Sequence, residues 1–245
     1  MAYRGSNLFL LSLGDPFQPF IYGQVSFPVR TAIQYDVKLI MDGENGELEY
    51  GGATNSSENS FSPKDEIKYW FSNFEAKKWL KKGFSKKDMD IYISPSIDEI
   101  LSKKINRKFW SYYNFWDPQE HYYYSSKNTG FMSNPDGRSE GTYSKYASLD
   151  DAIDGFHYYF MFLKFGIGRA TSDAAHEIRD KHLTRNEGIK LVRKYDGEFP
   201  KKYFKEFLKY CNLSSNDFYK ICDMWRAEHL WTKKNGKWKL KKQVI

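Results

Sequence analysis

Cysteine is scarce in this chain, which contains only Cys211 and Cys222. The two lie eleven positions apart, without the CxxC spacing of zinc sites. We therefore expect reduced thiols in a cytoplasmic protein, and neither a disulfide scaffold nor a zinc site. Long apolar runs are missing too. No run approaches the roughly 20 residues that span a bilayer, and no secretory cleavage site follows the N-terminus, so we expect no membrane span.

Acidic residues are absent from the C-terminal end. Residues 233–245 hold six lysines and no Asp or Glu, whereas the whole chain carries a net charge of +7. Seven minus six leaves +1 for the other 232 residues. A nearly neutral body does not provide the broad basic face of nucleic-acid-binding proteins, so we expect no nucleic-acid partner. The hydrophobic content of 40% and aromatic content of 18% support a packed core.

Nucleotide-binding signatures are also missing, since the sequence has no Walker-type phosphate loop and no GxGxxG. One apolar run, Val37–Met41, predicts a strand, and the acidic, glycine-rich segment Asp42–Gly52 follows it directly. Open α/β sheets bind ligands at the carboxyl ends of their strands. Glycines let a ligand approach the backbone closely, and carboxylates can hold a metal or move protons. Asp42–Gly52 is therefore a candidate site. The alternative is a solvated turn with Asn45-Gly46 at its tip.

Helical patterns dominate the second half of the chain. Ser148, Thr184 and Ser214 each precede an acidic residue three positions later, which predicts helix N-termini. Trp231–Leu240, with its Asn-Gly pair, predicts a β-hairpin. Its lysines either protect a solvated edge or, in the alternative, dock an acidic partner. Besides a strand over 108–115 and a long loop over 128–144, the sequence predicts helices near 25–35, 64–80, 149–163 and 172–181. Capping boxes at Ser85 and Ser96 predict two further short helices. The helix after Thr184 is expected to end at Asp196-Gly197, another to begin at Pro200, and the helix after Ser214 to reach about Glu228.

Four ordered motifs make the chain resemble a known family: Gly14–Gln24, Gly43–Gly52, Phe115–Gln119 and Gly166–Asp173. They are similar to motifs of the bacterial N-acetyl sugar amidotransferases, which act in O-antigen synthesis and in pseudaminic and legionaminic acid modification. That family belongs to the PP-loop ATP pyrophosphatases, whose domain is Rossmann-like. Its members begin with a cysteine-containing segment and a Ser-Gly-Gly-x-Asp-Ser loop, and neither occurs here.

The resemblance implies an α/β fold. It consists of the C-terminal remnant of a Rossmann-like PP-loop domain (adenine nucleotide alpha hydrolase-like), followed by a mainly α-helical domain with a terminal β-hairpin. The expected division is residues 1–62 as the truncated end of the PP-loop domain, 63–147 as an aromatic mixed α/β segment, and 148–245 as the helical C-terminal domain.

The implied reaction converts a sugar acetamido group to an acetamidino group in bacterial surface polysaccharide biosynthesis. ATP with Mg²⁺ would adenylylate the amide oxygen, and ammonia would displace AMP. Ammonia would come from a glutaminase pair resembling imidazole-glycerol-phosphate synthase. Two alternatives stay open: another PP-loop activity such as tRNA modification, and a non-catalytic subunit or remnant, because the ATP-binding loop is absent.

The glycine-rich segment supplies the expected catalytic residues. Glu44 and Asn45 would face the nucleotide or the acyl-adenylate, while Glu47 and Glu49 would coordinate Mg²⁺ or accept a proton from ammonia. A second set of residues is expected to bind the substrate: Gln24, Tyr50, Arg169, Thr171, Ser172, Asp173 and His176.

The segment Gly166–Asp173 joins two helices and brings Arg169 close to a helix N-terminus, a natural anion site. We expect it to bind a phosphate or carboxylate of the substrate. In the alternative, Ser172 caps the helix and Arg169 is a surface cation. His176 and His182 do not share a helix face, so we expect no metal pair there.

Aromatic residues between Trp110 and Tyr124 could stack on a sugar, but core packing is the commoner explanation and the one we favour. His157 lies in the aromatic run that ends at Phe160, which favours a packed core residue. His121 and His229 carry no functional signal.

Overall fold

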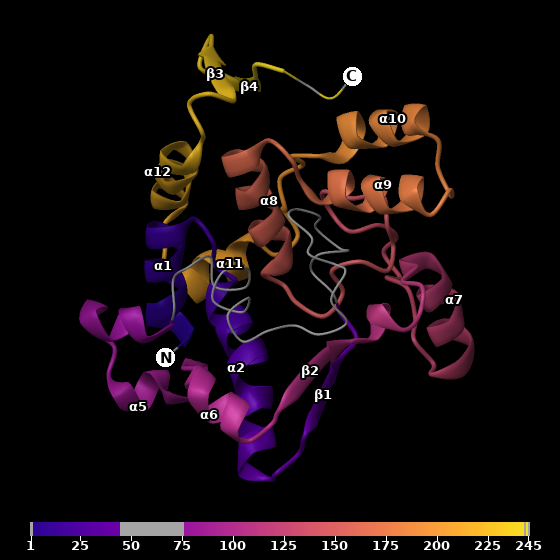
Figure 1. Ribbon diagram of the computed structural model, residues 1–245. Coiled ribbons are helices and arrows are strands. Elements are labelled where there is room, and N and C mark those ends of the chain that lie inside the picture. Colours follow the sequence, from indigo (N-terminus) through magenta and orange to yellow (C-terminus); the bar gives the residue numbers. More distant parts are fainter. Residues whose placement is uncertain (1, 45–75, 243, 245) are drawn as a thin grey trace. The chain divides into compact units, whose positions relative to one another are not determined.

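The computed structural model describes residues 2–44, 76–242 and 244 (Figure 1). These residues form two compact units. Unit 1 runs from Gln18 to Trp116, and unit 2 combines Ala2–Phe17 with Asp117–Ile245.

The elements of unit 1 are α2 (Gln18–Gln34), β1 (Leu39–Asp42), η2 (Ala76–Lys82), α5 (Lys86–Met89), η3 (Asp90–Tyr92), α6 (Ile97–Ser102), β2 (Asn106–Phe109) and η4 (Trp110–Tyr112). The elements of unit 2 are α1 (Ala2–Leu13), α7 (Pro118–Asn128), α8 (Asp154–Phe165), α9 (Arg169–Arg179), α10 (Arg185–Tyr195), α11 (Phe204–Cys211), α12 (Ser215–Trp225), β3 (Trp231–Lys234) and β4 (Lys237–Leu240). This is a mixed α/β protein in which helices dominate, as the sequence predicts.

The predicted strand near Val37 forms in unit 1 as β1. It pairs in parallel with β2, with Leu39 opposite Asn106 and Asp42 opposite Phe109. Helix α2 packs against β1, and the buried Arg107 donates to the Val25 carbonyl at 3.1 Å. The pair is therefore joined to α2 by a buried hydrogen bond as well as by packing.

The helix before β1 is longer than the expected 25–35, because it begins at Gln18. Pro19 lies in its first turn, where the missing amide hydrogen costs nothing. Pro28 lies in its interior and removes one backbone hydrogen bond. The expected strand over 108–115 is also displaced: β2 spans Asn106–Phe109, and a short 3-10 helix follows it.

An aromatic core fills unit 2 between α8, α11 and α12. Phe156 stacks on Phe207 with 3.9 Å between ring centroids, and Phe218 meets Phe156 edge-on at 6.0 Å. Both cysteines are free and buried in this core. Burial raises the pKa of each thiol to about 12, so both stay protonated at neutral pH.

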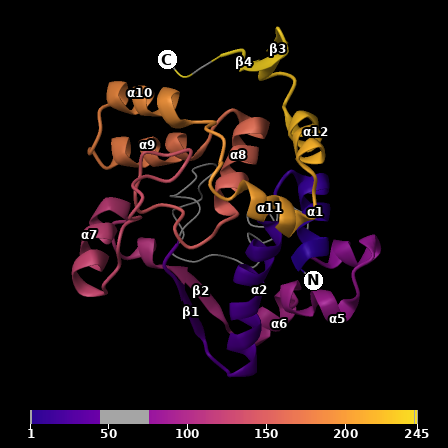
Figure 2. The same ribbon diagram turned by 180° about the vertical axis from the view of Figure 1, so that it is seen from behind.

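Helices α9 and α10 lie side by side (Figures 1 and 2). Gly188 permits this approach, because a Cβ there would lie 2.7 Å from Ile178 Cδ1. The Thr184 hydroxyl and the Glu187 carboxylate form the predicted capping box of α10. The predicted terminal hairpin is also confirmed, with β3 and β4 antiparallel and Trp231 opposite Leu240.

Two helix starts in unit 2 differ from the sequence prediction. Helix α8 begins at Asp154 and not after Ser148, because Ser148 adopts a left-handed conformation with φ 56°. Helix α9 begins at Arg169, three residues before the expected Ser172. Helix α7, with Asp117 as its N-cap, was not predicted.

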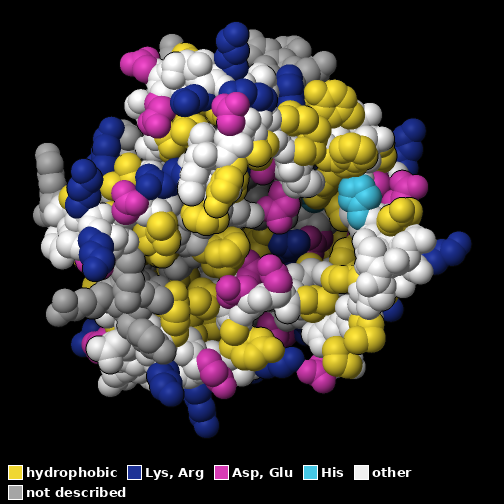
Figure 3. Space-filling view, turned by 90° about the horizontal axis from the view of Figure 1, so that it is seen from below, with side chains coloured by type: hydrophobic (Ala, Val, Ile, Leu, Met, Phe, Trp, Pro, Cys, Tyr) yellow, Lys and Arg dark blue, Asp and Glu magenta, His cyan; other side chains and the backbone are white. Residues whose placement is uncertain are grey.

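On the face that Figure 3 shows, Lys and Arg side chains are scattered among acidic and hydrophobic ones. Among the described helices, none is long and apolar enough to cross a membrane.

Candidate functional site

The described part of the glycine-rich segment lies at the end of β1 in unit 1. Gln24 on α2 donates to the Glu44 carboxylate at 3.2 Å, so the structure brings these two predicted site residues together. Beside them, Arg107 forms an ion pair with Asp42 and donates to Asp42 Oδ1 at 3.0 Å. These four residues, with Val25 and Gly43, line an open hollow of about 360 Å³.

The remaining predicted residues of this segment are Asn45, Glu47, Glu49 and Tyr50, and they lie outside the described residues. Among the described residues, the hollow offers two carboxylates and an arginine whose charge is already paired with Asp42. This set does not fit the phosphates of ATP, because two carboxylates repel them. The assignment of Glu44 and Gln24 to catalysis and binding stays a prediction.

The N-terminus of α9 in unit 2 holds a carboxylate of the chain itself. Asp196 accepts the backbone amides of Gly168 at 3.0 Å and Thr171 at 3.1 Å, and also the Thr171 hydroxyl. Burial raises the pKa of Asp196, although the hydrogen bonds from Thr171 and Gly168 oppose that shift. The amides that a substrate anion would use are therefore bonded to Asp196, which was not singled out from the sequence.

Arg169 and Asp173 face each other one turn apart on α9, with 3.0 Å between Arg169 Nε and Asp173 Oδ1. The Arg169 guanidinium also donates to the Tyr158 hydroxyl and lies over the Tyr158 ring, 4.6 Å from its centroid. Asp173 accepts a second hydrogen bond from the Thr142 hydroxyl. Arg169 is only 17% exposed, so it is not the surface cation of the alternative interpretation.

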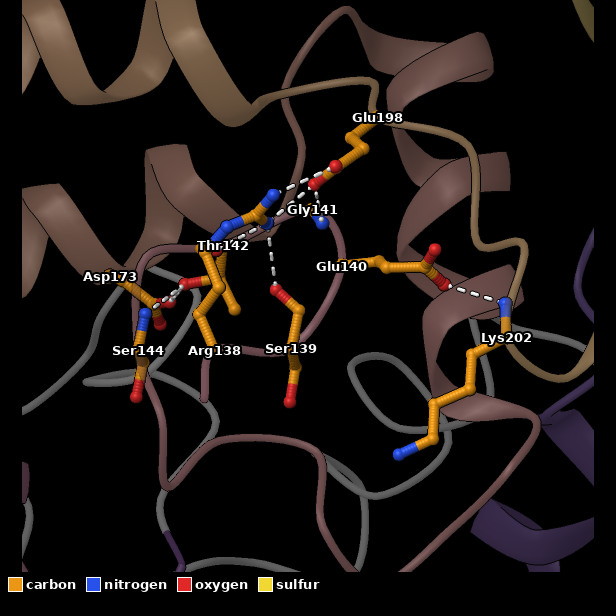
Figure 4. A network of polar contacts seen from close by, with 9 residues as sticks. All are labelled: Arg138, Ser139, Glu140, Gly141, Thr142, Ser144, Asp173, Glu198 and Lys202. Carbon is orange, nitrogen blue, oxygen red and sulfur yellow. Dashed lines mark hydrogen bonds and ion pairs between the residues drawn. The ribbon is translucent and has the colours of Figure 1, made fainter. Parts of the chain in front are cut away.

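The long loop over 128–144 is confirmed, and polar contacts fix its end (Figure 4). Arg138 forms two hydrogen bonds to the Glu198 carboxylate, at 2.6 and 2.9 Å. The Gly141 amide donates to the same carboxylate at 2.9 Å. The Lys202 amide donates to Glu140 at 3.0 Å. These contacts hold the loop against the segment between α10 and α11, and so position Thr142 over α9.

Tyr143 in this loop and Tyr146 just after it interact with Glu177 on α9. Burial first, and Asp173 second, raise the pKa of Glu177 above its ordinary value, while His182 and Tyr143 act in the opposite sense. Burial and the Glu177 charge raise the pKa of Tyr143 and Tyr146, so both hydroxyls stay neutral at pH 7. We call Tyr143, Tyr146, Arg169, Asp173 and Glu177 the α9 cluster.

A second group adjoins this cluster at the other end of α9. His182 Nε2 lies 2.7 Å from Asp117 Oδ2. The hydrogen bond to Asp117 raises the pKa of His182. Burial alone would raise the pKa of Asp117, but the hydrogen bonds from His182 and from the first amides of α7 hold it below its ordinary value. The buried His176 lies 2.7 Å from an Arg179 nitrogen.

His157 of unit 2 is largely buried, as predicted, but it is not purely a packing residue. Its Nδ1 lies 2.9 Å from Asp15 Oδ1, and Phe17 contacts its ring with 5.5 Å between centroids. Burial lowers the pKa of His157, but the Asp15 charge outweighs it and the pKa lies above the ordinary value. Burial alone would raise the pKa of Asp15, but the His157 charge and hydrogen bond outweigh it, so the pKa of Asp15 lies below its ordinary value.

The structure thus divides the predicted site residues between two places. Gln24 and Glu44 meet in unit 1, whereas Arg169, Thr171, Ser172, Asp173 and His176 all lie on α9 in unit 2. Sequence reasoning missed Tyr143, Tyr146 and Glu177 as a group. The sequence did contain a signal for this group, because Asp117 belongs to the third motif and Asp173 to the fourth. In the structure these two residues lie at opposite ends of one polar cluster.

The comparison that bears on this cluster concerns the C-terminal part of the chain. Residues 140–244 match the family described as LPS biosynthesis protein WbpG-like, C-terminal domain. No curated protein matches the chain. The match supports a relationship to lipopolysaccharide biosynthesis proteins, and the whole α9 cluster lies inside the matched residues.

Proposed function

We propose that this chain acts in the conversion of a sugar N-acetyl group to an acetamidino group during lipopolysaccharide biosynthesis, with the α9 cluster at the amination step. The observation that carries the proposal is the position of a half-buried carboxyl with a raised pKa, Glu177, beside two tyrosines in the matched segment. The four motifs that resemble N-acetyl sugar amidotransferases provide the reaction class.

The chemistry requires that ammonia attack the activated amide carbon and that its nitrogen lose a proton. A general base is most effective when its pKa lies near the working pH, and burial shifts Glu177 in that direction. Glu177 is therefore the proton acceptor in this proposal. Tyr143 and Tyr146 stay protonated. The Tyr143 hydroxyl is shielded from solvent, so Tyr146 is the tyrosine whose hydroxyl would donate to a sugar oxygen.

The Arg169–Asp173 pair positions the cluster, because both side chains are more than four-fifths buried and Asp173 also holds the loop through Thr142. The oxygen that leaves the amide carbon must depart on an activating group, which the family resemblance gives as AMP from ATP and Mg²⁺. We assign that activation to no described residue. Ammonia would be supplied by a separate glutaminase pair.

A pre-activated substrate tests the amination step without ATP. The O-methyl imidate of N-acetylglucosamine, with ¹⁵N-labelled ammonium, should give the ¹⁵N acetamidine and methanol faster in the presence of the chain. Mass spectrometry would follow the replacement of OCH₃ by ¹⁵NH₂. Glu177→Gln keeps the shape of the side chain but removes the base, and should lower the rate about 10²- to 10⁴-fold, the usual contribution of general acid–base catalysis.

Glu206→Gln is the matched control, because Glu206 is an exposed acid on α11 in the same unit. It should leave the rate unchanged. Equal rates for the unmodified chain and Glu177→Gln would rule out the role of Glu177. The proposed function itself fails if the imidate reacts no faster with the chain than in buffer and saturation-transfer NMR detects no binding of N-acetylated or nucleotide-linked N-acetylated sugars.

A further inference from the structure

Three side chains at the far end of α9 offer donor atoms to a common point. Asp117 precedes α7, Asp180 ends α9, and His182 lies in the turn before α10. One ligand atom from each lies within 4.8 Å of the other two. Three segments of the chain therefore meet with an imidazole nitrogen and two carboxylates.

Asp180 shows that this group is incomplete as a set of hydrogen bonds. Its Oδ2 is shielded from solvent and has no hydrogen-bond partner. A buried carboxylate oxygen without a hydrogen-bond partner destabilises the folded state, because the oxygen has lost its hydration without compensation. The residue is held there by its backbone, because the Asp180 amide donates to the His176 carbonyl at 2.8 Å and ends the helix. An additional positive ligand would satisfy this oxygen.

Asp117 is oriented toward the same point. Its Oδ1 accepts the amides of Gln119 at 2.9 Å and Glu120 at 3.1 Å, which fixes the carboxylate at the N-terminus of α7. Its Oδ2 is then directed at His182. Metal sites commonly contain such a carboxylate, with one oxygen held by the protein and the other directed toward the ion.

We propose that Asp117, Asp180 and His182 form a binding site for one divalent transition-metal ion. One imidazole and two carboxylates suit Zn²⁺ or Mn²⁺, whereas Mg²⁺ prefers oxygen ligands alone. Ligands on a tetrahedron with bonds of about 2.0–2.1 Å lie roughly 3.4 Å apart, which small side-chain rotations reach from the present spacing. His182 is 36% exposed and gives the ion a path from solvent. The site is independent of the proposed amination.

Metal binding to the full chain tests the proposal directly. After treatment with EDTA and its removal, the chain is titrated with ZnCl₂ and MnCl₂ by calorimetry, with MgCl₂ as the oxygen-preferring control. We expect one Zn²⁺ per chain and little response to Mg²⁺. Asp180→Asn keeps the size of the side chain and should weaken binding by more than the about 10- to 100-fold that loss of a supporting partner costs. The matched control is Asp150→Asn, an exposed acid of the same unit.

A second pair of variants guards against a folding defect in the first. His182→Ala removes a solvent-accessible ligand and should abolish the Zn²⁺ response, whereas His229→Ala, at another exposed histidine of the same unit, should not. Circular dichroism without metal checks that each variant is folded. Zn²⁺ should raise the Tm of the unmodified chain but not the Tm of Asp180→Asn or of His182→Ala. The proposal is overturned if neither Zn²⁺ nor Mn²⁺ binds, or if His182→Ala and His229→Ala bind Zn²⁺ with equal affinity. Asp117 and His182 would then be an ordinary ion pair.

Discussion

Replacement of Asp196 by alanine tests whether a distant carboxylate holds the first turn of α9. Asp196 lies after α10, 25 positions from Thr171, yet it accepts two backbone amides and a hydroxyl at that helix end. The first amides of a helix have no partner within the helix. Alanine would therefore leave the amides of Gly168 and Thr171 to water or to no acceptor.

The expected loss in the free energy of unfolding follows from the two amides that Asp196 accepts. Each buried donor left without an acceptor costs about 1–3 kcal/mol, and loss of an N-terminal cap costs about 0.5–2 kcal/mol. Asp196 is partly exposed, so water can reach the site and the lower values apply. Asp196→Ala should lower the free energy of unfolding by about 2 kcal/mol. Asp196→Asn keeps an oxygen acceptor without the charge that burial penalises, and should recover about half of the loss.

Urea unfolding followed by hydrogen exchange measures both the size and the place of this effect. With a urea m-value of about 2 kcal/mol/M, a loss of 2 kcal/mol shifts the midpoint by about 1 M. The amides at the start of α9 should exchange faster, while those in the Phe156 core should not. Asp150→Ala, at an exposed acid, is the control. A midpoint no lower than that of the control, with unchanged exchange in α9, would refute the capping role.

Two further predictions concern the same unit. The first concerns the His157–Asp15 pair. The raised pKa of His157 adds stability that is fully present below about pH 6.5 and is lost as pH rises through the folded pKa. The lowered pKa of Asp15 adds stability that is present above about pH 3.8 and is lost on acidification. The Tm advantage over His157→Asn should therefore shrink as pH rises above neutrality, and a constant difference would contradict the assignment. Gly197→Ala should cost more stability than Gly137→Ala by about 1–3 kcal/mol, because both have positive φ but only at Gly197 would a Cβ meet a ring, 2.1 Å from Phe162 Cε1. Equal Tm losses in the two variants would show that the ring moves aside freely.

Local signals predicted local structure well in this chain. The capping boxes at Ser85 and Thr184 open helices, and Asn235-Gly236 turns the terminal hairpin. Each of these signals acts through residues within four positions, so no distant contact is needed to realise it. The same signal failed at Ser148, where the backbone is left-handed and the chain continues as a loop to Asp154.

The candidate site could not be predicted from spacing, because distant ion pairs assemble it. Arg138 and Glu198 are 60 positions apart, and their bidentate contact holds the loop that positions Thr142 and Tyr143 near α9. Nothing in the sequence pairs that arginine with that glutamate. The Gly166–Asp173 motif pointed to Arg169, but its role at a site stays a prediction, and the partners of its side chain lie on α8 and α9.

The position of Asp196 changes which part of a substrate α9 can recognise. The sequence favoured an anion at the helix N-terminus, but a carboxylate of the chain bonds the amides there. The Arg169 charge is matched by Asp173 at 3.0 Å, and Glu177 adds a second carboxyl beside it. A cluster with more carboxyls than cations repels a phosphate and accepts a neutral group. In the proposed reaction, the α9 cluster would therefore receive the uncharged acetamido end of the sugar, and a phosphate of the substrate would bind elsewhere.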